Sequence, residues 1–132
     1  LGFDQNVVAA GQKGGKKLSA LKDAVERANA AGILIVAAAG NCCGDDIRKR
    51  PFYPASLDAE NIISVSALYD NDEVSATSSV GADIGAPGIG IYTTVGERSY
   101  GYLHQTSIAA AFVSGAAALI FSRRPELSPK EA

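Results

Sequence analysis

Two polar residues of this chain stand at positions where acyl-transfer chemistry would need them. Ser107 shortly precedes the run Ala109–Phe121, which is apolar on all sides and, although Ser114 interrupts it, too long for a strand. The run therefore predicts a buried helix with Ser107 at its N-terminus. A helix N-terminus offers unpaired N–H groups and a partial positive charge, which favour a developing oxyanion. Asn41 follows the apolar stretch Ile33–Ala39, a predicted buried strand, and brings a side-chain amide to the carboxyl end of that strand.

Helical and strand-like patterns alternate along the chain. Apolar residues at helical spacing, with charges between them, predict an amphipathic helix over residues 18–31 that Gly32 ends. The remaining pattern predicts a loop over 41–59, a strand over Ile62–Leu68, a polar segment over 71–79, a short strand over Ile89–Thr94 and an exposed approach over 96–105. This alternation predicts an α/β fold, a doubly wound and mostly parallel sheet with helices on both faces. Such folds place function at the carboxyl ends of the strands.

Composition and charge bound the possible functions. The 132 residues match the size of one domain, and 47% hydrophobic with 20% charged content is ordinary for a soluble α/β domain. A formal net charge of -2 gives no reason to expect nucleic acid or an anionic membrane as partner. The run Ala109–Phe121 is too short to span a bilayer.

The two polar residues belong to an ordered series of motifs that resembles the subtilisin-like serine proteases, the subtilases. In chain order the motifs are Leu1-Gly2, Gly32–Asn41, Tyr53-Pro54-Ala55, Asn61–Ala67, Ser78–Gly81, Asp83–Gly88 and Thr106-Ser107-Ile108-Ala109. Each motif is weak alone, but together they keep the family's order over nearly the whole chain. The resemblance implies part of the subtilisin-like fold.

The resemblance also implies a serine-type endopeptidase, with Ser107 as the nucleophile and Asn41 as a donor to the oxyanion. The substrate-binding positions that it implies are Leu1, Gly2, Ala38, Ala39 and Gly40. The expected partners are a peptide or protein substrate and the remainder of the catalytic domain upstream, because the family's Asp and His motifs precede this segment. No cofactor is required for this chemistry, and a secretory location follows only from the family.

The residues 1–132 are interpreted as the C-terminal part of one subtilase catalytic domain, truncated at both ends. Leu1-Gly2 resembles the end of the family's substrate-binding strand. Ser128, Pro129 and Glu131 form a helix-start signature, yet the sequence stops one residue later. Because the Asp and His of the triad are absent, the chain alone is expected not to hydrolyse peptides.

Departures from the family pattern leave a second function open. Gln105 replaces the glycine before Thr-Ser, and Phe112 replaces a polar histidine. The only histidine, His104, stands where the family usually has asparagine, so it is not expected to be the base. These changes keep open a catalytically inactive relative that acts as a peptide-binding or structural module.

Simpler interpretations of the same residues remain. Ser107 is expected to be no more than an N-cap if the resemblance fails, and Asn41 no more than a loop residue. Phe52 narrows the substrate pocket or merely packs. The adjacent Cys42 and Cys43 favour free thiols, because a disulfide between neighbours is strained.

Metal and nucleotide binding have weaker support in the sequence. The acidic pairs Asp45-Asp46 and Asp70–Asp72 allow a structural calcium ion, although no specific motif supports one and solvated loop acids explain them better. The segment Gly11–Lys17 has the composition of a phosphate-binding loop, but its spacing fails and Lys17 stands where Ser or Thr would be needed.

Overall fold

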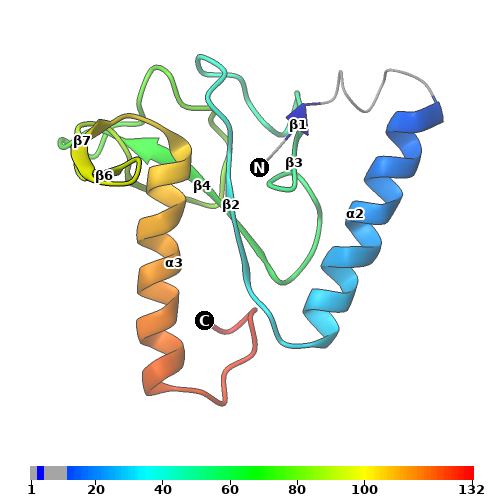
Figure 1. Ribbon diagram of the computed structural model, residues 1–132. Coiled ribbons are helices and arrows are strands. Elements are labelled where there is room, and N and C mark those ends of the chain that lie inside the picture. Colours follow the sequence, from blue (N-terminus) through cyan, green and yellow to red (C-terminus); the bar gives the residue numbers. More distant parts are fainter. Residues whose placement is uncertain (1–2, 5–11) are drawn as a thin grey trace.

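The computed structural model describes residues 3–4 and 12–132, so Leu1, Gly2 and Gly11 lie outside the described residues. Two long helices and seven strands are present in this part of the chain. They are β1 (Phe3–Asp4), α2 (Gln12–Ala30), β2 (Ile35–Ala38), β3 (Phe52–Tyr53), β4 (Ile62–Leu68), β5 (Ile84–Pro87), β6 (Ile91–Val95), β7 (Ser99–Leu103) and α3 (Thr106–Arg123). Figure 1 shows α3 and α2 as two upright rods with β2 between them.

The centre of the fold is a parallel sheet in the order β2-β4-β5. Its register pairs Ala38 with Val65 and Val65 with Ile84. Strand and helix alternation along the chain, with parallel strands, confirms the predicted α/β class. Two small antiparallel pairs, β1-β3 and β6-β7, flank this sheet.

The alternation of side chains along β2 and β4 divides the core into two clusters. On one face Val65 and Ala67 pack against Ala109 of α3 and Ala86 of β5. On the other face Ala37 and Ala39 pack against Ile47 and Ala55 of the loop that follows β2. The helix α3 therefore closes one face and a loop closes the other.

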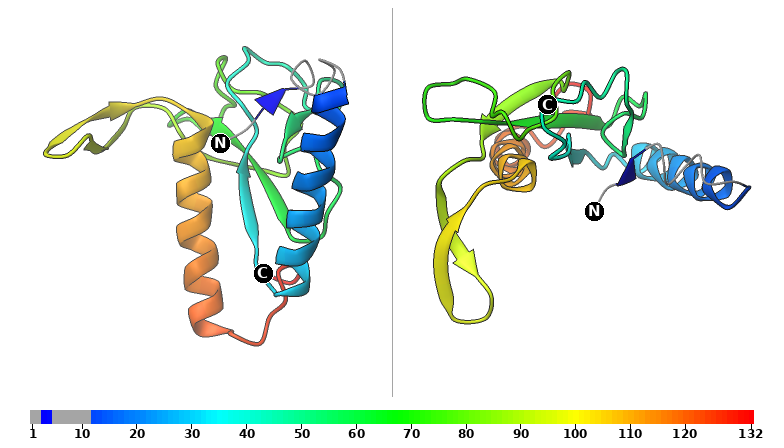
Figure 2. Two further views of the ribbon diagram at one scale, coloured as in Figure 1. Left: turned by 45° about the vertical axis from the view of Figure 1, so that its right-hand side comes forward. Right: turned by 90° about the horizontal axis from the view of Figure 1, so that it is seen from above.

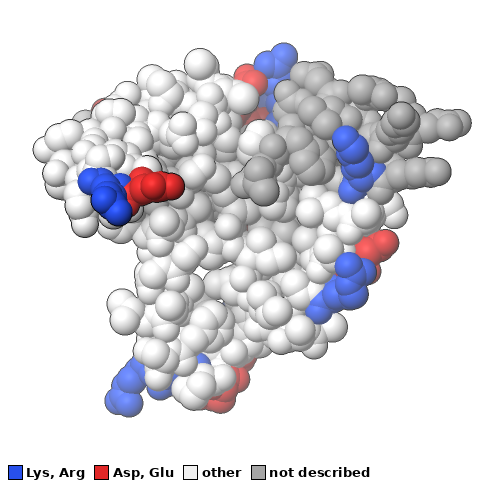
Figure 3. Space-filling view, viewed as in Figure 1, with Lys and Arg blue, Asp and Glu red and all other residues white. Residues whose placement is uncertain are grey.

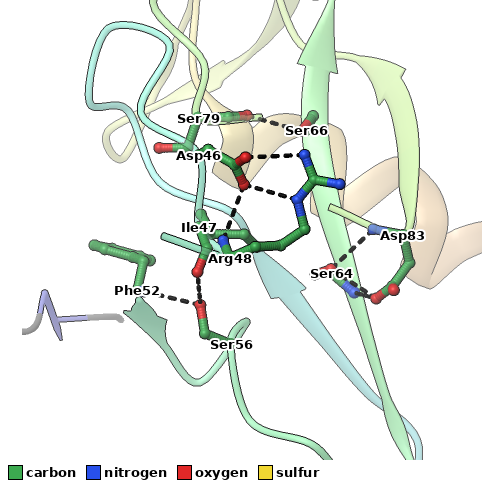
Figure 4. Close-up of polar contacts among 9 residues, drawn as sticks. All are labelled: Asp46, Ile47, Arg48, Phe52, Ser56, Ser64, Ser66, Ser79 and Asp83. Atoms are coloured by element: carbon green, nitrogen blue, oxygen red, sulfur yellow. Dashed lines mark hydrogen bonds and ion pairs between the residues drawn. The ribbon is translucent and has the colours of Figure 1, made fainter. Parts of the chain in front are cut away.

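The loop-covered face is also held by buried polar groups (Figure 4). Ser66 Oγ donates to Ser79 O at 2.8 Å, and Ser64 Oγ donates to the Asp83 carboxylate at 2.6 Å. Both serines are buried, so these bonds satisfy hydroxyls that would otherwise be desolvated without a partner. They fix the segment 75–83 against β4.

The element limits differ from the prediction in understandable ways. The helix α2 begins at Gln12 rather than 18, because the lysines and glycines before Leu18 carry no apolar signal. That helix also includes Gln12–Lys17, so the structure offers no phosphate-binding loop there. The predicted exposed approach contains β7, and the predicted loop contains β3. The helix-start signature at Ser128 forms a single turn, in which Glu131 accepts from Ser128 N at 2.9 Å.

The predicted full burial of α3 and of strand 33–39 is wrong. Leu119 is 72% exposed, Phe112 is 48% exposed, and Ile33 is 54% exposed. Only one side of α3 contacts the sheet, through Ala109, Ala110 and Val113. The space-filling view shows a surface over α3 that is almost free of charge between its two ends (Figure 3).

By length and composition alone, the 18-residue α3 is apolar enough to cross a membrane, in contrast to the shorter run considered in the sequence. Its packing against β2, β4 and β5 accounts for the apolar residues on one side of the helix, and the apolar residues on the other side are exposed.

The β6-β7 hairpin projects away from the sheet just before α3 (Figure 2). Its register pairs Tyr92 with Tyr102, and Tyr100 follows on the same face of the ribbon. All three rings are more than 60% exposed, and the Tyr92 and Tyr100 rings stack with centroids 5.9 Å apart.

Candidate functional site

The N-terminus of α3 is anchored against the carboxyl end of β5. Gln105 is the N-cap residue, with extended backbone angles and no side-chain cap bond. Its N–H donates to Gly88 O at 2.8 Å. A Cβ on Gly88 would lie 2.6 Å from the Ala67 Cβ and 3.0 Å from Gln105 O, so only glycine permits this close approach.

Ser107 is the second residue of α3 and is exposed, whereas Thr106 before it is fully buried. Because Gln105 is the N-cap, the interpretation of Ser107 as a mere N-cap is wrong. At this position the hydroxyl stands beside the unpaired N–H groups of the first helical turn. Ser107 is thus exposed and lies at the positive end of the helix.

Asn41 is joined to the same helix end by its side chain. Its Oδ1 accepts from Thr106 N at 2.9 Å and from Thr106 Oγ1 at 3.1 Å. A backbone N–H can only donate, so these bonds settle which end of the amide faces the helix. The Nδ2 group is therefore not the one that bonds Thr106, and among the described residues it has no acceptor.

Gly40, the residue before Asn41, has to be a glycine because of its backbone conformation and its close packing. Gly40 has φ +103°, a conformation that side chains rarely adopt, and an added Cβ would lie 3.1 Å from the Phe52 ring. Its carbonyl accepts from Ser79 N at 2.8 Å. Phe52 and Ser79 therefore hold the turn that follows β2, and this turn sets the position of Asn41.

These elements surround a cavity of about 450 Å³, here called the Asn41–Ser107 cavity. Its lining includes Ala38, Gly40, Phe52 and Ala110 besides the two residues that name it. Of the predicted substrate-binding residues, Ala38 and Gly40 line the cavity. Ala39 does not, and it is fully buried in the loop-covered core.

The structure places no base beside Ser107 within the described residues. His104 is exposed, and its Nδ1 accepts from Gly90 N at 2.9 Å across the foot of the hairpin. One ring nitrogen is therefore already used to fasten the hairpin. The described part of the chain brings together a hydroxyl and an amide donor, but nothing that would remove the hydroxyl proton.

Comparison with known proteins shows which family this chain belongs to. The model of the subtilase family matches residues 7–132. The chain belongs to the subtilase family. It is 43% identical over 115 residues to subtilisin DY of Bacillus licheniformis, which covers 86% of this chain and 41% of that protein. It is 38% identical over 109 residues to subtilisin NAT of Bacillus subtilis subsp. natto, covering 81% and 28%.

A third subtilase relative is the alkaline elastase YaB of Bacillus sp. (strain YaB), 36% identical over 110 residues, with 82% of this chain and 28% of that protein covered. The chain thus spans well under half the length of these curated relatives.

Two departures from the subtilase pattern, Gln105 and Phe112, are not among the residues that line the Asn41–Ser107 cavity. Phe112 points away from the sheet and is 48% exposed, so the bulky ring does not displace the first turn of α3. Gln105 is exposed and contributes only backbone contacts. Ala110 takes part in the cavity wall, where a small side chain leaves room.

Acidic loop residues near the site are paired with arginines. Arg48 donates two side-chain hydrogen bonds to Asp46, and Arg50 lies 3.0 Å from the Asp45 carboxylate. The Arg48 guanidinium lowers the pKa of Asp46 to about 2. Among residues 12–132 no three His, Cys, Asp or Glu side chains converge as metal ligands would.

Sequence reasoning overlooked the positioning roles of Thr106 and Gly88. It left open whether Phe52 narrows the pocket or packs, and in the structure Phe52 lines the cavity and lies against Gly40. Thr106 carries a detectable signal, since a hydroxyl residue at a helix start can bond a polar partner from another element. The roles of Gly88 and Phe52 depend on contacts between distant segments, and no local pattern contains them.

Proposed function

We propose that this chain carries the nucleophile and an oxyanion donor of a serine endopeptidase. The observation that supports it is the pair of hydrogen bonds from Thr106 to Asn41 Oδ1, which leaves Asn41 Nδ2 as the donor of that amide while Ser107 lines the same cavity. Membership of the subtilase family supports peptide bonds as the substrate class.

In this proposal a base takes the Ser107 hydroxyl proton while Oγ attacks the peptide carbonyl carbon. The carbonyl oxygen becomes an oxyanion and accepts from Asn41 Nδ2 and from the Ser107 N–H at the positive end of α3. Collapse releases the amine, whose nitrogen takes the proton from the base, and leaves an acyl group on Ser107, which water then removes. The subtilisin asparagine is the established example of such a donor, and its loss costs about 10²–10³ in kcat.

The base and the residue that orients it would come from the remainder of the catalytic domain upstream. Two features of this chain support such a partner. Among the described residues, β2 pairs only with β4, so one of its edges is open. The outer side of α3 exposes apolar side chains such as Leu119 and Ile120. Slower hydrogen exchange of the β2 amides in the full-length protein than in this chain would support the docking, and equal rates would contradict it.

A fluorophosphonate probe tests the nucleophile directly. In the full-length protein we expect one adduct on Ser107, located by peptide mass, and none in the Ser107→Ala variant. This chain alone is the control and should stay unlabelled, because no base stands beside Ser107 in the part of the chain that the structure describes. Absence of the adduct from the folded full-length protein would favour the inactive relative that binds peptides without cleaving them.

The oxyanion role has a near-isosteric test. Asn41→Asp keeps an oxygen for Thr106 but removes both N–H donors, so we expect kcat to fall by about 10²–10³ with little change in KM. Asn71→Asp, in an exposed turn, is the matched control and should leave kcat unchanged. Equal activity of the two variants would exclude Asn41 as a donor.

A further inference from the structure

The residue after Asn41 begins a pair of cysteines that the proposed protease chemistry does not use. Cys42 and Cys43 are both exposed and both free thiols. Among the described residues neither sulfur takes part in a hydrogen bond. The chain contains two cysteines in total, so no third thiol competes with this pair.

The backbone around the pair is a fixed tight turn. Asp45 N donates to Cys42 O at 2.8 Å, and the two central residues, Cys43 and Gly44, have φ of 44° and 82°. Positive φ at both central positions defines a type I′ turn. The turn is tied to its neighbours because Gly44 N donates to Ser78 O at 3.0 Å and Val80 N donates to Asp45 O at 2.9 Å.

Adjacent cysteines suit a bridging atom better than a direct disulfide. The α carbons of neighbouring residues lie about 3.8 Å apart, which is below the usual range for disulfide-bonded cysteines. One atom inserted between the sulfurs lengthens the link and removes that misfit. A soft centre that forms two bonds to sulfur is therefore the ligand that this pair fits.

We propose that Cys42 and Cys43 form a dithiol site that binds one trivalent arsenical beside the Asn41–Ser107 cavity. With an arsenoxide, both S–H bonds break and two As–S bonds form. The arsenoxide oxygen leaves with the two protons as water. Arsenic stays trivalent throughout, so the step needs no oxidant or reductant.

The test adds phenylarsine oxide to the native 132-residue chain and measures its intact mass. We expect one adduct per chain that survives excess monothiol and is removed by a dithiol such as 2,3-dimercaptopropanol. Cys42→Ser and Cys43→Ser should each weaken retention by about 10²–10⁴-fold, because the second bond forms at the high effective concentration of a neighbouring residue.

Three results would overturn the proposal. They are two adducts per chain, retention by either single variant equal to that of the unchanged chain, and a native chain whose mass shows the thiols already joined as a disulfide.

The location has its own readout. Arsenical binding should shift the side-chain amide resonances of Asn41 in a nitrogen–proton correlation spectrum and leave those of Asn71 in place. An adduct that leaves both amides unchanged would place the ligand away from the cavity, against the proposal. This measurement does not involve peptide hydrolysis, so its outcome is independent of the proposed protease function.

Discussion

The first turn of α3 and the remainder of the same helix are held in opposite ways. In the first turn Thr106 and Ala109 are fully buried, and polar bonds join the helix end to Asn41 and Gly88. Further along, large apolar side chains such as Leu119 face outward. The precision of the candidate site therefore depends on a few contacts at one helix end, while the outer face of the helix adds little within the described residues.

The first test of this difference compares one buried and one exposed apolar side chain. Val65 lies beneath the first turn and has no exposed surface. Val65→Ala should lower the free energy of unfolding by about 2–3 kcal/mol, through lost burial and a cavity. Leu119→Ala should change it by no more than about 0.5 kcal/mol. Urea denaturation measures both, and similar losses would mean that the outer face of α3 is already covered in solution.

Two glycines give the next comparison. Gly88→Ala forces a Cβ against Ala67 and the Gln105 carbonyl, so we expect a loss of about 1–3 kcal/mol in unfolding free energy. Gly115→Ala, in the middle of α3, meets nothing within 4 Å and should gain about 1 kcal/mol from helix propensity. Changes of the same sign in thermal denaturation would contradict the close packing at the first turn.

A smaller effect is expected from one hydroxyl. Thr106→Val keeps the shape but removes the Oγ1 bond to Asn41 Oδ1, leaving the backbone bond in place. We expect a loss of about 0.5–1.5 kcal/mol. Ser122→Ala removes an exposed hydroxyl bonded to Leu119 O and should be close to neutral. A neutral Thr106→Val would show that the backbone bond alone orients the amide.

The pH dependence of stability should differ between a partly buried and an exposed ion pair. The pKa of Asp46 is lowered by Arg48 from 3.8 to about 2, so its contribution to stability is complete above pH 4 and is lost as pH falls through 2. Arg48→Met should flatten this part of the stability profile. Arg124→Met, in the pair with Glu126 after α3, is the control. Arg124 also lowers the pKa of Glu126, but both partners there are largely exposed, so solvent screens the pair and the effect should be smaller. Identical profiles for the two variants would contradict the assignment.

The sequence predicted the meeting of Asn41 and Ser107, because a strand end and a helix start in an α/β fold converge at one edge of the sheet. It predicted Ile62–Leu68 with the observed limits, since that segment is a continuous apolar and small-residue run. It predicted the helix α3 but failed for its burial, because a helix that is apolar on all sides is typically covered on all sides. It also missed β7, because Gly101 interrupts the strand and its tyrosines face solvent.

The hairpin tyrosines make the region before Ser107 visible to optical spectroscopy. The chain has no tryptophan, and three of its five tyrosines, Tyr92, Tyr100 and Tyr102, lie together on β6 and β7. Intrinsic ultraviolet emission and the aromatic circular dichroism therefore report mainly on a ribbon that leads straight into the candidate nucleophile. Any ligand that binds against this ribbon should change these tyrosine signals, so its binding can be followed without a label.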